Sequence, residues 1–250
     1  MTESTKWVIR FRTSQAARFR LFCFPFAGGA ASAFNAWHER LPDWVDICAV
    51  QYPGRETRWN EPPFSESSAL AAAILDGIKS QMEDLPYAFF GHSLGSLMSF
   101  EVARLLVESG LPEPVRLFLS ARRAPPFRPH PPEMTGLPDS EFKKNLSELN
   151  GTPSAVLENT ELMALLMPAL RADFSLDENY RYQDGPVLHQ RFTIYGGVED
   201  FRVPEEQLRA WRDFTKGESS TRIFPGDHFY LKDPHSPLYP ALSQELQQLG

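Results

Sequence analysis

Continuous apolar runs of strand length alternate with helix-like patterns along the first half of this chain. The runs are RFRLFCFPF (18–26), VDICAVQY (45–52), YAFFGH (87–92) and VRLFLSA (115–121). Between them, residues 67–82 and 94–109 repeat apolar positions at helical spacing. Ser32 is expected to cap a shorter helix that ends at Leu41. This alternation is typical of βαβ units and predicts an α/β fold with a mostly parallel, twisted sheet flanked by helices.

The pattern changes after Ala124, where six prolines lie between residues 125 and 138 and exclude a regular helix or a central strand. Helical patterns follow at 139–149, 157–166 and 168–182, and then strand and helix patterns alternate again at 190–197, 204–215, 220–226 and from Ser236 onward. We therefore expect one domain over residues 1–250, with a helical insertion at 125–186 that forms a lid over the site. The alternative is a helical layer that packs for stability alone.

Composition narrows the class of protein. The chain has 250 residues, 42% of them hydrophobic, and a net charge of −7, so it can bury a full core but lacks the basic surface of a general nucleic-acid binder. Its start, MTESTKWVIRFR, has no apolar core of a secretory signal, and no apolar run reaches the ~18 residues of a membrane helix. We expect a cytoplasmic protein that binds neither nucleic acid nor membrane. No heptad pattern indicates an oligomer, so a monomer is expected.

The two cysteines, Cys23 and Cys48, both lie in apolar runs. We expect them to be buried, inert thiols rather than a disulfide or a catalytic group. No cluster of cysteine and histidine has the spacing of zinc ligands.

The pentapeptide Gly91-His92-Ser93-Leu94-Gly95 matches the G-x-S-x-G pattern of a nucleophile elbow. The turn from strand to helix is so tight that the serine takes a strained conformation, and the flanking glycines keep side chains out of the turn. YAFF precedes the motif as a strand, and LMSFEVARLLVES follows it as an amphipathic helix. This context predicts an α/β-hydrolase fold with Ser93 as the nucleophile, rather than a serine in an ordinary turn. The free N–H groups of the helix start favour negative charge beside it.

The base and its acid should follow Ser93 in the order acid, then histidine. His228 lies directly after the strand pattern STRIF, whereas His235 lies farther on at a helix start and is expected at the surface. Asp200 follows the strand pattern that ends in Gly196-Gly197, where a short carboxylate can hold the imidazole; Glu199 is the fallback. Asp227, next to His228, is expected to be a turn residue. The sequence thus predicts a triad of Ser93, Asp200 and His228.

An oxyanion hole needs two N–H donors, one from the residue after the nucleophile and one from the loop after an earlier strand. Leu94 is the first candidate, and Ala27, in the loop FPFAGGA, is the second. The loop matches neither a dinucleotide-binding nor a Walker pattern, and this chemistry requires no metal or dissociable cofactor. Reasoning from the residues ends here at an acyl hydrolase or acyl transferase.

Eight motifs, in order along almost the whole chain, carry a resemblance to a known family. They are FPFAGGA with the following Ser-Ala-Phe, YPGRE (52–56), FFGHSLG (89–95), SARRAP (120–125), LPDSEF…LNGTP (137–153), LMPALRADF (166–174), GGVED (196–200) and PGDHF (225–229). The set resembles the type II thioesterases of nonribosomal peptide and polyketide synthesis. In that family the triad falls on Ser93, Asp200 and His228, and the oxyanion donors on Ala27 and Leu94.

The resemblance implies hydrolysis of acyl or aminoacyl thioesters from the phosphopantetheine arm of a carrier protein. The carrier protein is the expected partner. The enzyme itself is expected to need no cofactor, because the phosphopantetheine is part of the substrate. Carrier domains are usually acidic, so a basic rim would help docking. Arg122, Arg123 and Arg128 are candidates for this rim, and Arg55 and Arg58 are further candidates. Each arginine has an alternative role as a solvated charge or as half of an intramolecular salt bridge.

Three other functions remain open on the sequence. A small-molecule esterase or lipase would use the same triad without carrier docking. A medium-chain thioesterase that ends fatty-acid synthesis would share the motifs and differ in acyl length. A non-catalytic interaction module is the third, and the complete set of Ser93, Asp200 and His228 argues against it.

Overall fold

A seven-stranded sheet forms the centre of the computed structural model, which describes residues 5–12, 16–129 and 133–249. The strands are β1 (Val8–Ile9), β2 (Phe19–Phe24), β3 (Val45–Val50), β4 (Tyr87–His92), β5 (Arg116–Ser120), β6 (Arg191–Gly197) and β7 (Ser219–Phe224). Their spatial order is β1-β3-β2-β4-β5-β6-β7, with β1 antiparallel to β3 and every other pair parallel. The predicted mostly parallel sheet is confirmed, and it is the sheet of an α/β-hydrolase fold. The short edge strand β1 was not predicted.

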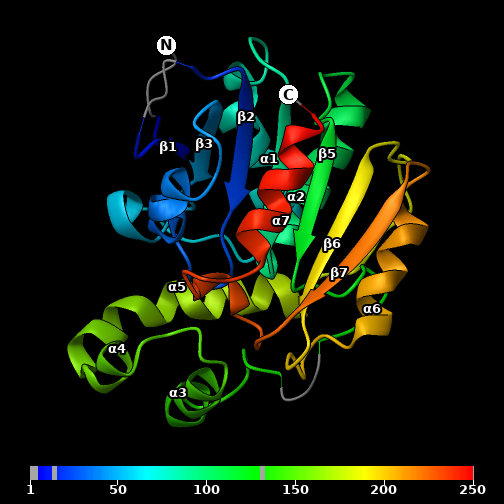
Figure 1. Ribbon diagram of the computed structural model, residues 1–250. Helices are drawn as coiled ribbons and strands as arrows, with labels where there is room; N and C mark the ends of the chain where they lie inside the picture. Colours follow the sequence, from blue (N-terminus) through cyan, green and yellow to red (C-terminus); the bar gives the residue numbers. More distant parts are fainter. Residues whose placement is uncertain (1–4, 13–15, 130–132, 250) are drawn as a thin grey trace.

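Helices cover both faces of this sheet. The α-helices are α1 (Ser67–Ile78), α2 (Leu94–Ser109), α3 (Asp139–Glu148), α4 (Ser154–Glu158), α5 (Thr160–Glu178), α6 (Glu205–Arg209) and α7 (Leu238–Gln247). Shorter 3₁₀ helices are η1 (Ala31–Glu39), η2 (Glu56–Arg58), η3 (Lys79–Gln81), η4 (Ala210–Phe214) and η5 (Tyr230–Lys232). One apolar core lies between the sheet and α1, α2 and η4, and a second lies between the sheet and η1 and α7 (Figure 1). Strands buried on both faces explain the continuous apolar runs in the sequence.

The insertion between β5 and β6 lies at one end of the sheet. Figure 1 shows α5 crossing below the C-terminal ends of β2 and β5, with α3 and α4 farther from the sheet. The insertion also has a small core of its own, built around Phe142, Leu146, Leu157 and Phe174. Prolines 131 and 132 of the proline-rich stretch lie outside the described residues. Among the helices that the structure describes, none is long and apolar enough to cross a membrane.

Two local predictions were wrong. Ser32 does not cap η1, which begins at Ala31 with Ala30 before it and has no side-chain cap. The two helices expected on either side of Met167 are one continuous helix, α5, with Pro168 inside it. A proline removes one backbone hydrogen bond and crowds the preceding turn, but burial of the apolar side chains of α5 offsets that cost.

A buried charge cluster attaches α7 to the sheet. Glu245 of α7 accepts hydrogen bonds from Arg116 of β5 and from Arg222 of β7, the second at 2.7 Å. Arg116 and Glu245 are both buried. Breaking a buried ion pair by removing one partner leaves the other charge uncompensated, so this cluster fixes the helix against two strands.

Glu245→Ala is therefore expected to lower the free energy of unfolding by about 3–5 kcal/mol, measured by denaturant titration. The matched control is Glu218→Ala, which breaks the exposed pair with Arg191 and is expected to cost less than about 1 kcal/mol. Equal losses in the two variants would show that burial of the Glu245 cluster is not what stabilises α7.

Candidate active site

The strand order creates a crevice at one end of the sheet. The chain passes from β2 to β3 on one side and from β4 to β5 on the other, although β2 and β4 are neighbours. The loops that follow β2 and β4 therefore diverge, and in open α/β sheets ligands bind where connections diverge in this way. The loop after β2 carries Ala27, and Ser93 directly follows β4. The loops after β6 and β7, which carry Asp200 and His228, also neighbour each other.

Ser93 occupies the turn between β4 and α2 with φ 55° and ψ −116°. A positive φ is unfavourable for a residue with a Cβ, by about 1–3 kcal/mol, and persists only where the surroundings enforce it. The flanking glycines show how they do so. A Cβ on Gly91 would lie 2.3 Å from the Gly95 carbonyl oxygen, and a Cβ on Gly95 would lie 2.0 Å from that of Phe24. No other residue fits either position, so the predicted elbow is present.

Hydrogen bonds from β5 keep the elbow in place. The Ser93 N–H donates to the Ser120 carbonyl at 2.8 Å. The Ser96 hydroxyl, in the first turn of α2, lies 2.8 Å from the Gly91 carbonyl and 2.9 Å from that of Ser120, and it accepts from the Ser120 N–H at 2.9 Å. Sequence reasoning did not identify Ser96 or Ser120, because serines outside a motif are common in turns and helices.

His228 and Asp200 meet across two loops. Nδ1 of His228 lies 2.6 Å from Oδ2 of Asp200, and Oδ1 of Asp200 accepts from the Arg202 N–H at 3.0 Å. Backbone hydrogen bonds from Val198 to Phe224 and from Glu199 to Gly226 join the two loops. Glu199 is exposed, and Asp227 accepts from the Phe229 N–H within its own turn. Glu199, the fallback acid, is thus not the carboxylate beside His228, and Asp227 is the expected turn residue. His235 is exposed as predicted.

A cavity of about 70 Å³ brings the candidate residues together. Ser93, His228, Ala27 and Leu94 all line it, and the insertion closes it with Leu146 of α3, the following Leu149, and Phe174 and Asp177 of α5. A second cavity, of about 580 Å³, lies beside it and shares Phe26, Gly28, Gly151 and Thr152 as walls. No hydrogen bond among the described residues uses the Ala27 N–H, and the Leu94 N–H, at a helix start, has no partner within its helix. Two donors thus remain free next to Ser93.

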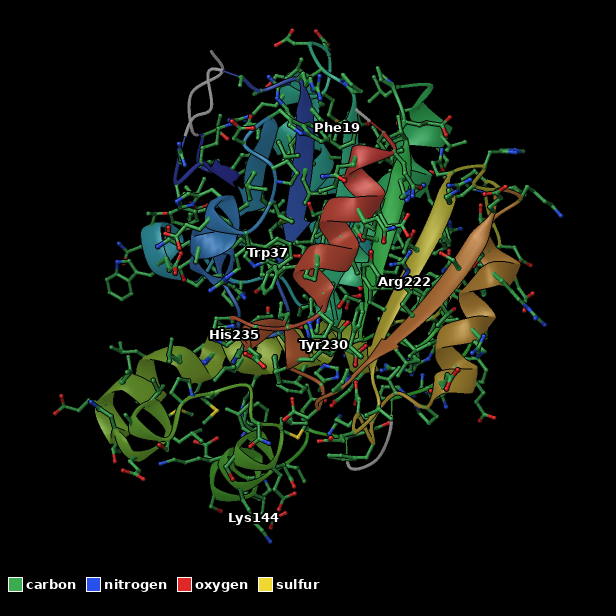
Figure 2. All side chains as sticks on the ribbon, in the orientation of Figure 1. Phe19, Trp37, Lys144, Arg222, Tyr230 and His235 are labelled. Carbon is green, nitrogen blue, oxygen red and sulfur yellow. The ribbon has the colours of Figure 1, made fainter. Side chains whose placement is uncertain are left out.

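His92, the residue before Ser93, is buried beneath the site. Its Nδ1 lies 2.8 Å from the Ser120 hydroxyl, which in turn lies 2.5 Å from the Tyr230 hydroxyl. Burial lowers the pKa of His92 well below its ordinary value, so the ring is neutral. Its ring packs at 5.4 Å, between centroids, from that of His228. Tyr230 lies at the end of the sheet that faces α5 (Figure 2), and this chain of contacts connects β4 and β5 to the loop that carries His228.

The expected basic rim is wrong for Arg122 and Arg123. Their exposed fractions are 3% and 6%, and both donate to Asp177 of α5, Arg123 at 2.8 Å. Burial and the neighbouring arginines lower the pKa of Arg123 to about 8. Arg55 and Arg58 are buried as well. The intramolecular role, which the sequence left open, applies here: Arg55, like Arg122 and Arg123, pairs with a carboxylate of the insertion, and Arg58 pairs with Glu61.

Arg128 differs from the other arginines, since its side chain is 51% exposed and its ion pair with Glu133 is long, at 3.7 Å.

Within the described parts of the chain, no three histidine, cysteine, aspartate or glutamate side chains are grouped closely enough to bind a metal ion. Cys23 and Cys48 are free and buried, as predicted.

Known proteins with the same sequence features place this geometry in context. The family model "Thioesterase domain" matches residues 19–238. The gramicidin S biosynthesis protein GrsT of Aneurinibacillus migulanus is 38% identical over 99% of this chain and 96% of its own. The structure of the type II thioesterase BorB from the borrelidin biosynthetic cluster is 32% identical with a TM-score of 0.89, covering 98% of this chain and 100% of that one.

RedJ, a thioesterase from the prodiginine pathway in Streptomyces coelicolor, is 36% identical with a TM-score of 0.85 over 92% of this chain and 86% of its own. The likeness to these proteins extends from the strands through the helical insertion. It confirms the predicted fold class and the predicted family resemblance.

Asp200→Asn is expected to lower kcat by about 10³–10⁴-fold, because an amide cannot hold the imidazole in the required tautomer. The measurement is release of free thiol from an acyl-pantetheine thioester. Glu199→Gln, one residue away and exposed, is the control and should leave kcat within about twofold. A larger loss from Glu199→Gln than from Asp200→Asn would show that Glu199, and not Asp200, is the acid of the triad.

Proposed function

This chain belongs to the thioesterase family and is a thioester hydrolase, and we propose that it removes acyl and aminoacyl groups from the phosphopantetheine arm of carrier proteins in nonribosomal peptide or polyketide synthesis. The observation that supports this most is full-length similarity to GrsT, a gramicidin S biosynthesis protein, to the type II thioesterase BorB of the borrelidin cluster, and to YbtT, a type II thioesterase from the yersiniabactin NRPS/PKS pathway. The reaction releases stalled or incorrect groups, so that the synthase can continue.

In the proposed mechanism, Ser93 is the nucleophile and His228 the base. Nδ1 of His228 is engaged by Asp200, so Nε2 is the nitrogen that takes the Ser93 proton as the hydroxyl oxygen attacks the thioester carbonyl carbon. The N–H groups of Ala27 and Leu94 stabilise the oxyanion. The carbon–sulfur bond then breaks, the thiol leaves with the proton from His228, and the acyl group remains on Ser93 as an ester.

Water completes the cycle. His228 takes a proton from the water as its oxygen attacks the acyl-serine carbonyl, and the bond from carbon to the Ser93 oxygen then breaks while His228 returns the proton to that oxygen. Asp200 stabilises the imidazolium that forms in each half of the reaction. No step needs a metal or a dissociable cofactor, because the leaving thiol is part of the substrate.

The two cavities suggest how the substrate lies. The small cavity, of about 70 Å³, suits a short acyl or small aminoacyl group. The larger cavity, lined in part by Arg40 and Lys232, suits the arm with its phosphodiester. The helical insertion roofs both cavities and acts as the lid over this site.

The carrier docks in this proposal at the mouth of the larger cavity, where Arg40 and Lys232 are complementary to an acidic partner, and the exposed Arg128 is a candidate for a further contact with it. The protein works as a monomer in the cytoplasm, and its two free thiols are typical of a reducing compartment. It acts on neither nucleic acid nor membrane.

One alternative function is that of a medium-chain fatty acyl thioesterase. An acyl chain of eight or more carbons needs more space than a short acyl group, so the acyl length that the enzyme prefers separates the two functions. A general small-molecule esterase is the other alternative, and it would gain nothing from a carrier.

The test uses a carrier protein loaded through phosphopantetheine with acetyl, propionyl, aminoacyl or dodecanoyl groups, followed by intact-protein mass spectrometry. We expect faster release of the short and aminoacyl groups from the carrier than from the matching free pantetheine thioesters, and none with Ser93→Ala. Faster release of dodecanoyl would favour the fatty acyl alternative. Equal rates on carrier and free thioesters, with good oxoester turnover, would indicate a general esterase.

A further inference from the structure

Two opposite charges outside the triad meet behind the loop that follows β2. Arg55, from the segment after β3, is 6% exposed, and Asp173 of α5 is 1% exposed. The guanidinium forms a two-pronged ion pair with the carboxylate, with N–O distances of 2.6 and 2.8 Å. Burial alone would lower the pKa of Arg55, but the charge and hydrogen bonds of Asp173 raise it above its ordinary value, so the guanidinium is charged.

Each partner of this pair also binds the Gly28–Gly29 segment of the loop. The Gly28 N–H donates to Oδ2 of Asp173 at 2.7 Å, and the guanidinium of Arg55 donates to the Gly29 carbonyl at 3.0 Å. Gly28 has φ +75°, and a Cβ there would lie 2.5 Å from the side chain of Leu170, one turn before Asp173 on α5. The helix therefore lies directly on the loop, and the ion pair binds the loop at two successive residues.

The position of Gly29 determines where the Ala27 N–H points. The Gly29 N–H donates to the Phe26 carbonyl at 2.8 Å. That carbonyl belongs to the same peptide unit as the Ala27 N–H, and in a trans peptide the two groups point in opposite directions. A shift of Gly29 would thus rotate the peptide that carries the Ala27 N–H, the proposed oxyanion donor.

The segment after β3 that carries Arg55 also binds the loop at Ala31. The Gln51 side chain donates to the Arg55 carbonyl at 3.0 Å and accepts from the Ala31 N–H at 2.8 Å. The loop is therefore bound from outside in its middle, at Gly28 and Gly29, and at its end, at Ala31. A rigid support of this kind is what an electrostatic site needs, because its dipoles must not reorganise during the reaction.

We propose that Arg55 and Asp173 are positioning residues for the oxyanion hole, and that their ion pair holds the Gly28–Gly29 segment so that the Ala27 N–H faces the carbonyl oxygen of the substrate. The inference rests on the proposed role of Ala27 but not on the carrier as a partner. It gives the YPGRE and LRADF motifs a shared role. It also makes α5 a fixed wall of the site, while α3 and α4 remain the outer part of the lid.

Asp173→Asn tests the pair with a free propionyl-pantetheine thioester, so that the result does not depend on carrier docking. We expect kcat to fall by about 10- to 100-fold, less than the 10²–10³-fold loss from deleting a donor, with KM changed by less than about threefold. Affinity for a trifluoromethyl ketone analogue of the substrate, which forms an oxyanion with Ser93, should fall by the same factor as kcat/KM. The control is Asp139→Asn, which breaks the exposed pair with Arg171 of the same helix and should leave both values unchanged.

The double variant Arg55→Met with Asp173→Leu separates positioning from stability. Removing both charges leaves neither one buried alone, so its thermal midpoint should be closer to that of the wild type than that of Asp173→Asn. Its kcat and analogue affinity should stay low. Arg55→Lys keeps the charge without the fork and should give an intermediate kcat with a stable fold. Wild-type kcat and analogue affinity in either folded variant would overturn the proposal.

Discussion

The contact between the first turn of α2 and the backbone of Phe24 is the constraint on which the site depends. Gly95 lies so close to the last residue of β2 that a Cβ there would be 2.0 Å from the Phe24 carbonyl oxygen. This contact sets the distance between the elbow and the loop that begins at Pro25. It brings the Leu94 N–H and the Ala27 N–H to the same cavity as Ser93.

The other components of the site are attached to this centre from two directions. On one side, the loops after β6 and β7 are joined by backbone hydrogen bonds, and a Cβ on Gly197 would lie 2.4 Å from the Asp227 carbonyl oxygen. That contact puts Asp200 within reach of His228. On the other side, α5 presses on Gly28 and closes the cavity, with Asp173 and Asp177 as its charged contacts to the core. Backbone contacts that only glycine permits thus fix the reacting groups, and buried ion pairs fix the wall around them.

The candidate site residues that could be found from the sequence lie in short motifs or directly after a strand pattern. The elbow needs glycines at fixed spacing between a strand and a helix, and Asp200 and His228 each follow a strand, so their positions could be predicted from the chain alone. The ion pairs could not, since Arg55 and Asp173 are far apart in sequence and nothing local marks them as partners. The same reason made Arg122 and Arg123 look like surface charges, because Asp177, which neutralises them, belongs to a helix of the insertion. Pro168 suggested a break in a helix that tertiary packing keeps continuous.

The central claim is that acyl groups pass through a covalent ester on Ser93. It is tested most directly by mixing the enzyme with an acyl-pantetheine thioester, quenching in acid within milliseconds and mapping the added acyl mass by peptide mass spectrometry. The account predicts one acyl group on the peptide that contains Ser93, formed before steady-state turnover and absent in the quench at time zero. An acyl group on another residue, with the Ser93 peptide unmodified at every quench time, would contradict it.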